Sequence, residues 1–243
     1  MINLLIILVV VSFSLLQIIE VFSFSSRVAG KYTKNMALGY TLQQTFFTAS
    51  RFLLILFLPS IAFLVESEIS VSDYSLTASL SLLVSAVASF WLLIKLNSSQ
   101  IFFQKVILNC QKNRVPKAIY LAFFQNNSDL INIHVKFNLK KINRRKFLTS
   151  FFAYFFLSSG FFFAFLLSNI FFEYRLTLSQ ITPLFHGIGA ILVAFYLDPM
   201  LSRSIDDESD NILWLRNIYT VIFGRVVIYL FTSCLFMLIA VFF

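Results

Sequence analysis

The sequence predicts an all-α integral membrane protein with six transmembrane helices. Of its 243 residues, 59% are hydrophobic and only 12% are charged, and the mean hydropathy is +0.85. A soluble globule of this size needs far more polar surface than the chain provides. We therefore expect residues 1–243 to form a single polytopic membrane domain, in which residues 97–146 make one long basic connection.

Six apolar stretches are long enough to cross a bilayer, since a helical crossing takes roughly 20 apolar residues. We expect spans over residues 2–24, 37–64, 75–96, 147–172, 179–201 and 216–243. The first stretch has no preceding basic residue and no small-residue cleavage site, so it is interpreted as a span and not as a signal peptide. Pro59 lies near the end of the second stretch and is expected to kink or stop that helix.

The distribution of lysine and arginine predicts the orientation. Eleven of the 19 basic residues lie between Lys95 and Lys146, in a connection short enough for the positive-inside rule to apply. This connection is therefore expected to be cytoplasmic. Successive loops lie on alternate sides of the membrane, so a cytoplasmic connection places both termini outside. The charges of every other loop agree with this topology.

The connection over residues 97–146 contains two kinds of sequence. Residues 101–110 have apolar side chains at helical spacing and predict that the third span continues beyond the membrane until Pro116. Residues 134–146 mix apolar and basic side chains and are expected to lie along the inner surface, attracted to anionic lipids. A simple topology anchor explains the same residues equally well. In either case the net charge of +8 indicates membrane topology and not a nucleic-acid partner.

Several kinds of chemistry have no support in the sequence. The two cysteines, Cys110 and Cys234, are far apart and show neither metal-ligand spacing nor a disulfide framework. The chain has no catalytic motif, no metal-ligand cluster and no glycine-rich nucleotide loop. No cofactor is therefore predicted, and the protein is expected not to be an enzyme.

Ionisable side chains inside the spans are the main candidates for function, because they are costly to hold in a bilayer. The candidates are Glu20, Arg51, His186, Asp198 and Arg225, together with Arg27 just beyond the first span. At about 1.5 Å per helical residue, Arg51 lies roughly 20 Å from the cytoplasmic start of its helix and Arg225 roughly 13 Å in. The other charged residues lie nearer the inner surface, and His186 lies toward the outer side.

The charges in this set do not balance. Three arginines (Arg27, Arg51 and Arg225) face two carboxylates (Glu20 and Asp198), which leaves a positive surplus. An unpaired guanidinium at depth needs water or an anionic ligand, and its planar fork suits phosphate. The alternative is that Glu20 or Asp198 pairs with an arginine only to lock helices together.

Three residues are weaker candidates: His186 from this set, and Arg203 and Asp206 outside it. For His186 a structural role is favoured, since it stands beside small residues that permit close helix contact. Asp198 precedes Pro199 and is expected to end the fifth span there, with its carboxylate directed into the bundle. The acidic run Asp206–Asp210 is interpreted as a solvated loop.

Three stretches of the chain contain the patterns of a known family: "FSSRVAGKYTKNMAL", "SRFLLILFLP" from Ser50, and "EYRLTLSQITPLFHGIGAILVAFYLDPMLSRSIDD" from Glu173. The patterns fall on Ser25, Arg27, Ala29 and Gly30, on Ser50 and Arg51, on Glu173, Tyr174 and Arg175, and on Asp198 and Pro199. In these residues the chain resembles the Amj family, small lipid II flippases that act as an alternate to MurJ.

The resemblance implies movement of an undecaprenyl-diphosphate-linked saccharide from the inner to the outer leaflet of the bacterial inner membrane. Arg27, Arg51 and Arg225 would then bind the diphosphate, with Glu20 and Asp198 as their charge partners or as sites of ion coupling. Three alternatives stay open: a flippase for an O-antigen-type unit, a transferase that holds magnesium with Asp198, Asp206 or Asp207, and a non-transporting assembly factor. The sequence is compatible with a homodimer and does not decide it.

Overall fold

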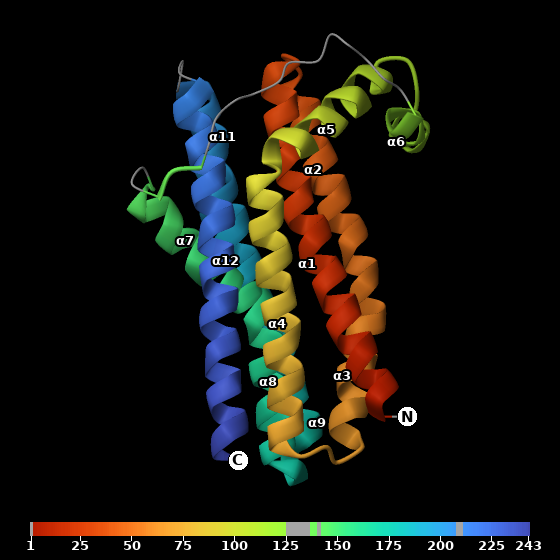
Figure 1. Ribbon diagram of the computed structural model, residues 1–243, viewed down its shortest axis with the longest axis vertical. Coiled ribbons are helices and arrows are strands. Elements are labelled where there is room, and N and C mark those ends of the chain that lie inside the picture. The colour runs from red at the N-terminus through yellow and green to blue at the C-terminus, as the bar shows by residue number, and fades with distance from the viewer. Residues whose placement is uncertain (1, 125–136, 140–141, 208–210) are drawn as a thin grey trace.

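The protein is a helical bundle with six helices that are long and apolar enough to cross a membrane, as the sequence predicted. The computed structural model describes residues 2–124, 137–139, 142–207 and 211–243, without the side chains of 206–207 and 211–213. The spans are Ile2–Tyr32, Met36–Glu66, Val71–Ile94, Arg144–Ile170, Phe172–Ile205 and Trp214–Phe242. Both termini lie at one end of the bundle (Figure 1), as an even number of crossings requires. Which end faces the cytoplasm stays a prediction.

Three of the spans are unbroken helices, and three are assembled from shorter pieces. The unbroken ones are α1 (Ile2–Tyr32), α4 (Val71–Ile94) and α12 (Asn211–Phe242). The second span consists of α2 (Met36–Ser50), the 3₁₀ turn η1 (Arg51–Leu53) and α3 (Leu54–Glu66). The fourth consists of α7 (Arg144–Tyr154), the π-helical η3 (Phe155–Ser159) and α8 (Gly160–Ile170). The fifth consists of η4 (Phe172–Tyr174), α9 (Arg175–Ser179), α10 (Thr182–Leu192), the π-helical η5 (Val193–Leu197) and α11 (Asp198–Asp207).

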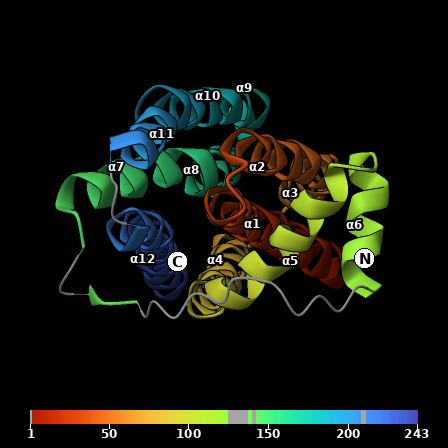
Figure 2. The same cartoon turned by 90° about the horizontal axis from the view of Figure 1, so that it is seen from above.

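The packing of the spans leaves the fifth one at the side of the bundle. The most extensive contact joins α4 to α12, where Ser79 and Ser233 bond to each other's backbone carbonyls at 3.0 and 2.9 Å. Small residues of this kind allow membrane helices to approach closely. Figure 2 shows α9, α10 and α11 in a row along one side, with α7 and α8 between that row and α12. The fifth span packs mainly on the fourth.

The turn from α1 to α2 depends on two glycines that face each other. A Cβ at Gly39 would lie 2.7 Å from the backbone oxygen of Ser26 and 2.8 Å from the Cα of Gly30. The Ser26 hydroxyl donates a hydrogen bond of 2.8 Å to the carbonyl oxygen of Gly39. Glycine is required here because the two backbones touch, and this crossing directs Arg27 of α1 toward the bundle interior.

Two prolines do not stop their helices. Pro59 lies inside α3, and the second span continues past it to Glu66. The expectation that the fifth span ends at Asp198 was wrong: Asp198 has helical angles (φ −64°, ψ −47°), and α11 continues to Asp207. A proline ring clashes with the carbonyl four residues earlier, here Phe195, and the widened π-helical turn Val193–Leu197 makes room for it.

The third span does not run on to Pro116, which corrects a further expectation. Helix α4 ends at Ile94, and α5 (Leu96–Cys110) leaves in a new direction (Figure 1) and packs along α1. Its buried residues Phe103, Val106 and Ile107 form a small core with α6 (Val115–Phe124), which has Pro116 in its first turn. The chain therefore turns after α4, and the apolar face of α5 packs against α1 and α6. Of the surface segment expected over 134–146, residues 134–136 and 140–141 lie outside the described residues, and α7 already begins at Arg144.

Candidate functional site

Glu20 is the centre of a cluster of charged side chains in the middle of the bundle. It lies on α1, and only 1% of its surface is exposed. One carboxylate oxygen accepts a hydrogen bond of 2.6 Å from Arg225 of α12, and the other lies 3.0 Å from Arg51 in the second span. A single carboxylate therefore joins the first, second and sixth spans.

Arg225 is completely buried and surrounded by polar and aromatic side chains. Its Nε donates to the hydroxyl of Tyr229 at 2.7 Å, and its Nη2 donates to the side-chain oxygen of Gln17. Tyr229 in turn donates to Gln17 at 2.6 Å, and the guanidinium stands 4.3 Å above the ring of Tyr154. Gln17 and Glu20 are one helical turn apart, as are Arg225 and Tyr229, so each pair faces the same neighbour. Burial makes this network costly to break.

A second ion pair joins the first span to the fifth. Arg27 Nη2 lies 2.5 Å from Asp198 Oδ1, and the side chain of Gln44 in α2 donates to the other oxygen of Asp198 at 3.3 Å. The guanidinium of Arg27 also lies 4.7 Å from the centre of the Tyr40 ring. The Arg27 side chain is buried, whereas that of Asp198 is 15% exposed. The carboxylate of Asp198 is thus directed into the bundle, although the helix does not end there.

Arg51 connects the Glu20 cluster to the fifth span. Its side chain is 21% exposed, the highest value among the three arginines, and it stacks 4.2 Å over Phe47. Its Nη1 lies 3.4 Å from Nε2 of His186 on α10. From its position in the predicted fifth span, His186 was expected toward the outer side of the membrane, away from the other charges. The structure places it against Arg51 because that arginine stands near the middle of its own span.

The cluster keeps a positive surplus even though each of the three arginines is paired with a carboxylate. Glu20 is shared by Arg51 and Arg225, so three guanidinium groups have two negative charges between them. Within the described part of the chain, Nε and Nη1 of Arg27 and Nη1 of Arg225 are buried and have no hydrogen-bond acceptor. Buried polar groups are rarely left without partners, and donors of this kind suit an anion with several oxygens.

Small cavities lie beside these charges, between the second and fifth spans. One of about 30 Å³ is lined by Gln44, Phe47 and Asp198 among others, and one of about 180 Å³ is lined by Arg27, Tyr40 and residues of α11. The first has room for only two or three water molecules, at roughly 10–15 Å³ each, so it is too small for a diphosphate. A large anion would reach the arginines only if the two spans moved apart.

The other sequence candidates do not join the cluster. Arg203 is exposed and lies on a different face of α11 from Asp198, beside α7. The side chains of Asp206 and Asp207 lie outside the described residues. Among the residues that are described, no group of three or more His, Cys, Asp or Glu side chains could hold a metal ion. The carboxylate cluster that a magnesium-dependent transferase needs is therefore not found in this part of the chain.

Four residues of the site were not identified from the sequence: Gln17, Gln44, Tyr154 and Tyr229. Two of them carried a signal, since Gln17 precedes Glu20 by three residues and Tyr229 follows Arg225 by four, which puts each on the same helix face as the charge. Gln44 and Tyr154 stand on other helices, and only the packing of those helices brings them near.

Comparison with known proteins supports one family. No curated protein and no solved structure matches the chain. The family described as "Amj: Alternate to MurJ" matches residues 13–241, which include four of the six spans in full, most of the other two, and all residues of the charged cluster. The match covers nearly the whole chain, and this multi-pass membrane protein therefore belongs to the Amj family.

Proposed function

We propose that the protein is a flippase that moves an undecaprenyl-diphosphate-linked saccharide, lipid II or a related envelope precursor, from the inner to the outer leaflet of the bacterial inner membrane. The observation that carries the proposal is the set of three membrane-buried arginines that share two carboxylates. A diphosphate would supply the missing negative charge. The family match supports a role as an alternate to MurJ.

Arg27 and Arg51 are the arginines that a diphosphate would meet first. Both line the boundary between the second and fifth spans, whereas Arg225 lies deeper and is fully buried. Phosphate oxygens would compete with Asp198 for Arg27 and with Glu20 for Arg51. Because arginine binds both carboxylate and phosphate through its planar fork, this exchange gives each arginine a new charged partner, while Glu20 keeps Arg225 and Asp198 keeps its hydrogen bond from Gln44. Glu20 and Asp198 thus hold the arginines between transport cycles.

The boundary between the second and fifth spans is where we expect the substrate path to open. Two polar contacts cross it near the charges, Gln44 with Asp198 and Arg51 with His186, and Arg27 of the first span reaches the same Asp198. A further cavity of about 330 Å³ lies at its other end, between α3 and the start of α10. The diphosphate would pass along this polar boundary while the polyprenyl tail stays in the lipid.

A non-transporting assembly factor is the main competing function, because it would also pair its buried arginines. The sharing of Glu20 by two arginines and the unsatisfied N–H groups of Arg27 and Arg225 favour anion binding over a purely structural lock.

The deciding experiment measures flipping directly. Purified protein is placed in liposomes with a lipid-linked diphosphate sugar, and the access of an external reagent to the sugar is followed. Wild type is expected to accelerate movement, and Arg51→Ala to remove the acceleration while remaining folded. Arg114→Ala, an exposed arginine between α5 and α6, is the matched control and should flip normally. Wild-type movement by Arg51→Ala contradicts the role of Arg51, and no movement by wild type favours the assembly factor.

A further inference from the structure

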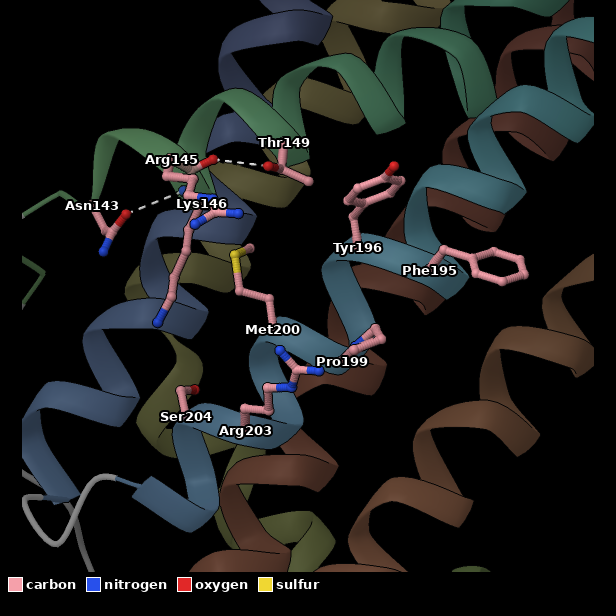
Figure 3. A pocket seen from close by; sticks show the side chains of 10 residues that line it. All are labelled: Asn143, Arg145, Lys146, Thr149, Phe195, Tyr196, Pro199, Met200, Arg203 and Ser204. Carbon is pink, nitrogen blue, oxygen red and sulfur yellow. Dashed lines mark hydrogen bonds between the residues drawn. The ribbon is translucent and has the colours of Figure 1, made fainter.

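A second group of basic side chains surrounds a cavity on the outside of the bundle, away from the charged cluster. The cavity has a volume of about 430 Å³ and lies between the beginning of α7 and the η5–α11 segment. Arg145 and Lys146 line it from α7, and Arg203 lines it from α11, as Figure 3 shows. Asn143, Thr149 and Ser204 add polar groups to its wall. Of the described residues that line it, none is acidic.

This cavity is separate from the site of the buried arginines. Asp198, which belongs to that site, faces α1 and α2, whereas Arg203 stands five residues later on another face of the same helix. Arg145 and Arg203 are exposed, and neither forms an ion pair with any described residue. They can therefore bind a ligand without breaking a contact inside the bundle.

The position of the cavity relates it to the membrane surface. Arg144 is the first residue of the fourth candidate span and Ile205 the last of the fifth, so the basic groups stand where both spans leave the apolar layer. Phe195 and Tyr196 line the same cavity, and they are 73% and 60% exposed. Aromatic side chains at this depth are typical of the membrane interface. Lipid acyl chains beside these rings would bring their head groups to Arg145 and Arg203.

We propose that this cavity binds the phosphate head group of a membrane lipid, from the leaflet at the end of the bundle where α5 and α6 lie. Its volume falls in the range of small-ligand sites, about 300–1,000 Å³, and leaves room for a phosphate or a diphosphate. Two lipids carry this chemistry: an anionic phospholipid, and the polyprenyl diphosphate carrier before it enters the bundle. The site itself does not depend on the proposed function; its use by the carrier does.

The test is lipid binding by the purified full-length protein, measured as bound adducts by native mass spectrometry. The probes are phosphatidylglycerol and undecaprenyl diphosphate, with phosphatidylcholine as the reference without net charge. Each basic side chain near an anionic surface contributes about a fivefold gain in affinity, so Arg145→Gln with Arg203→Gln is expected to weaken binding about 25-fold. Arg145→Lys with Arg203→Lys, which keeps the charge, should retain most of the affinity.

Matched controls separate this site from general charge and from the buried cluster. Arg114→Gln with Lys117→Gln removes two exposed basic groups in and just before α6 and should leave binding unchanged. Loss of phosphatidylglycerol alone in the Arg145/Arg203 glutamine variant assigns the site to bulk phospholipid, and loss of undecaprenyl diphosphate assigns it to the carrier. Wild-type binding of both lipids by that variant overturns the proposal, as does a loss seen only in Arg51→Ala. Because binding is measured apart from transport, a failure of flipping leaves this result intact.

Discussion

Arg27 and Asp198 are 171 residues apart in the chain, and their side chains form an ion pair of 2.5 Å between the first and fifth spans. The second span joins the same carboxylate through Gln44. The fifth span packs mainly on the fourth, so these polar contacts are a large part of what attaches it to spans one and two. Polar contacts between helices can exchange partners with a charged substrate, which close apolar packing cannot do.

Locking this boundary is expected to stop flipping. Ala37 and Ser202 line one cavity from opposite sides, and their replacement by cysteine allows a short, cleavable thiol cross-linker to join α2 to α11. Cys110 and Cys234 are first changed to serine. Transport should fall to background after cross-linking and return on cleavage. The control joins Ser72 to Ala240, where α4 packs on α12, and should not affect transport. Normal transport by the locked protein would show that the substrate does not pass here.

Glu20→Gln is expected to destabilise the protein strongly. The substitution leaves the buried Arg225 without its carboxylate partner. Removing one partner of a buried ion pair lowers the free energy of unfolding by about 3–5 kcal/mol. Adding Arg225→Gln removes the unpaired charge, so the double variant should regain a large part of this loss. Thermal unfolding in detergent, arranged as a double-mutant cycle, measures both effects. Equal melting temperatures for wild type and Glu20→Gln would mean that Glu20 does not hold the helices together.

Gly39→Ala is expected to destabilise the turn between the first two spans. The added Cβ would lie 2.7 Å from the backbone oxygen of Ser26, and overpacking of this kind costs about 1–3 kcal/mol. Gly187→Ala is the matched control, since a Cβ at Gly187 meets no atom within 4 Å. The two melting temperatures should differ, with only Gly39→Ala lowered. A similar loss in both variants would point to the loss of glycine itself and not to this contact.

His186→Leu is expected to slow flipping and to lower stability only slightly. His186 Nε2 lies 3.4 Å from Arg51 Nη1, a long hydrogen bond, so its loss is expected to cost about 0.5–1.5 kcal/mol of stability and to leave Arg51 less well positioned for the substrate. His186→Gln keeps a polar partner and should transport within about twofold of wild type. Initial rates in liposomes, with melting temperatures of each variant, provide the comparison. Normal rates for His186→Leu would leave the histidine with a packing role only.

The sequence predicted the membrane class, the six spans and the identities of the buried charges, because these depend on local properties. Apolar length defines a span whatever its neighbours are, and an ionisable residue inside one is visible without knowing what it faces. Helix breaks were less predictable. Lys95 ends α4 because α5 packs on α1, and Asp198 stays helical because a π-helical turn accommodates Pro199. Neither cause is local to the residue that shows it.

Only the tertiary structure decided which charges meet. Composition already gave three arginines and two carboxylates, but the sharing of Glu20 between Arg51 and Arg225, and the pairing of Arg27 with Asp198, depend on how α1 is rotated against its neighbours. Gly30 and Gly39 set that arrangement through backbone contact between α1 and α2. The partners of a side chain in a bundle depend on how helices pack, and those helices can be far apart in the sequence. Local patterns in a single sequence do not reveal which helices will be neighbours.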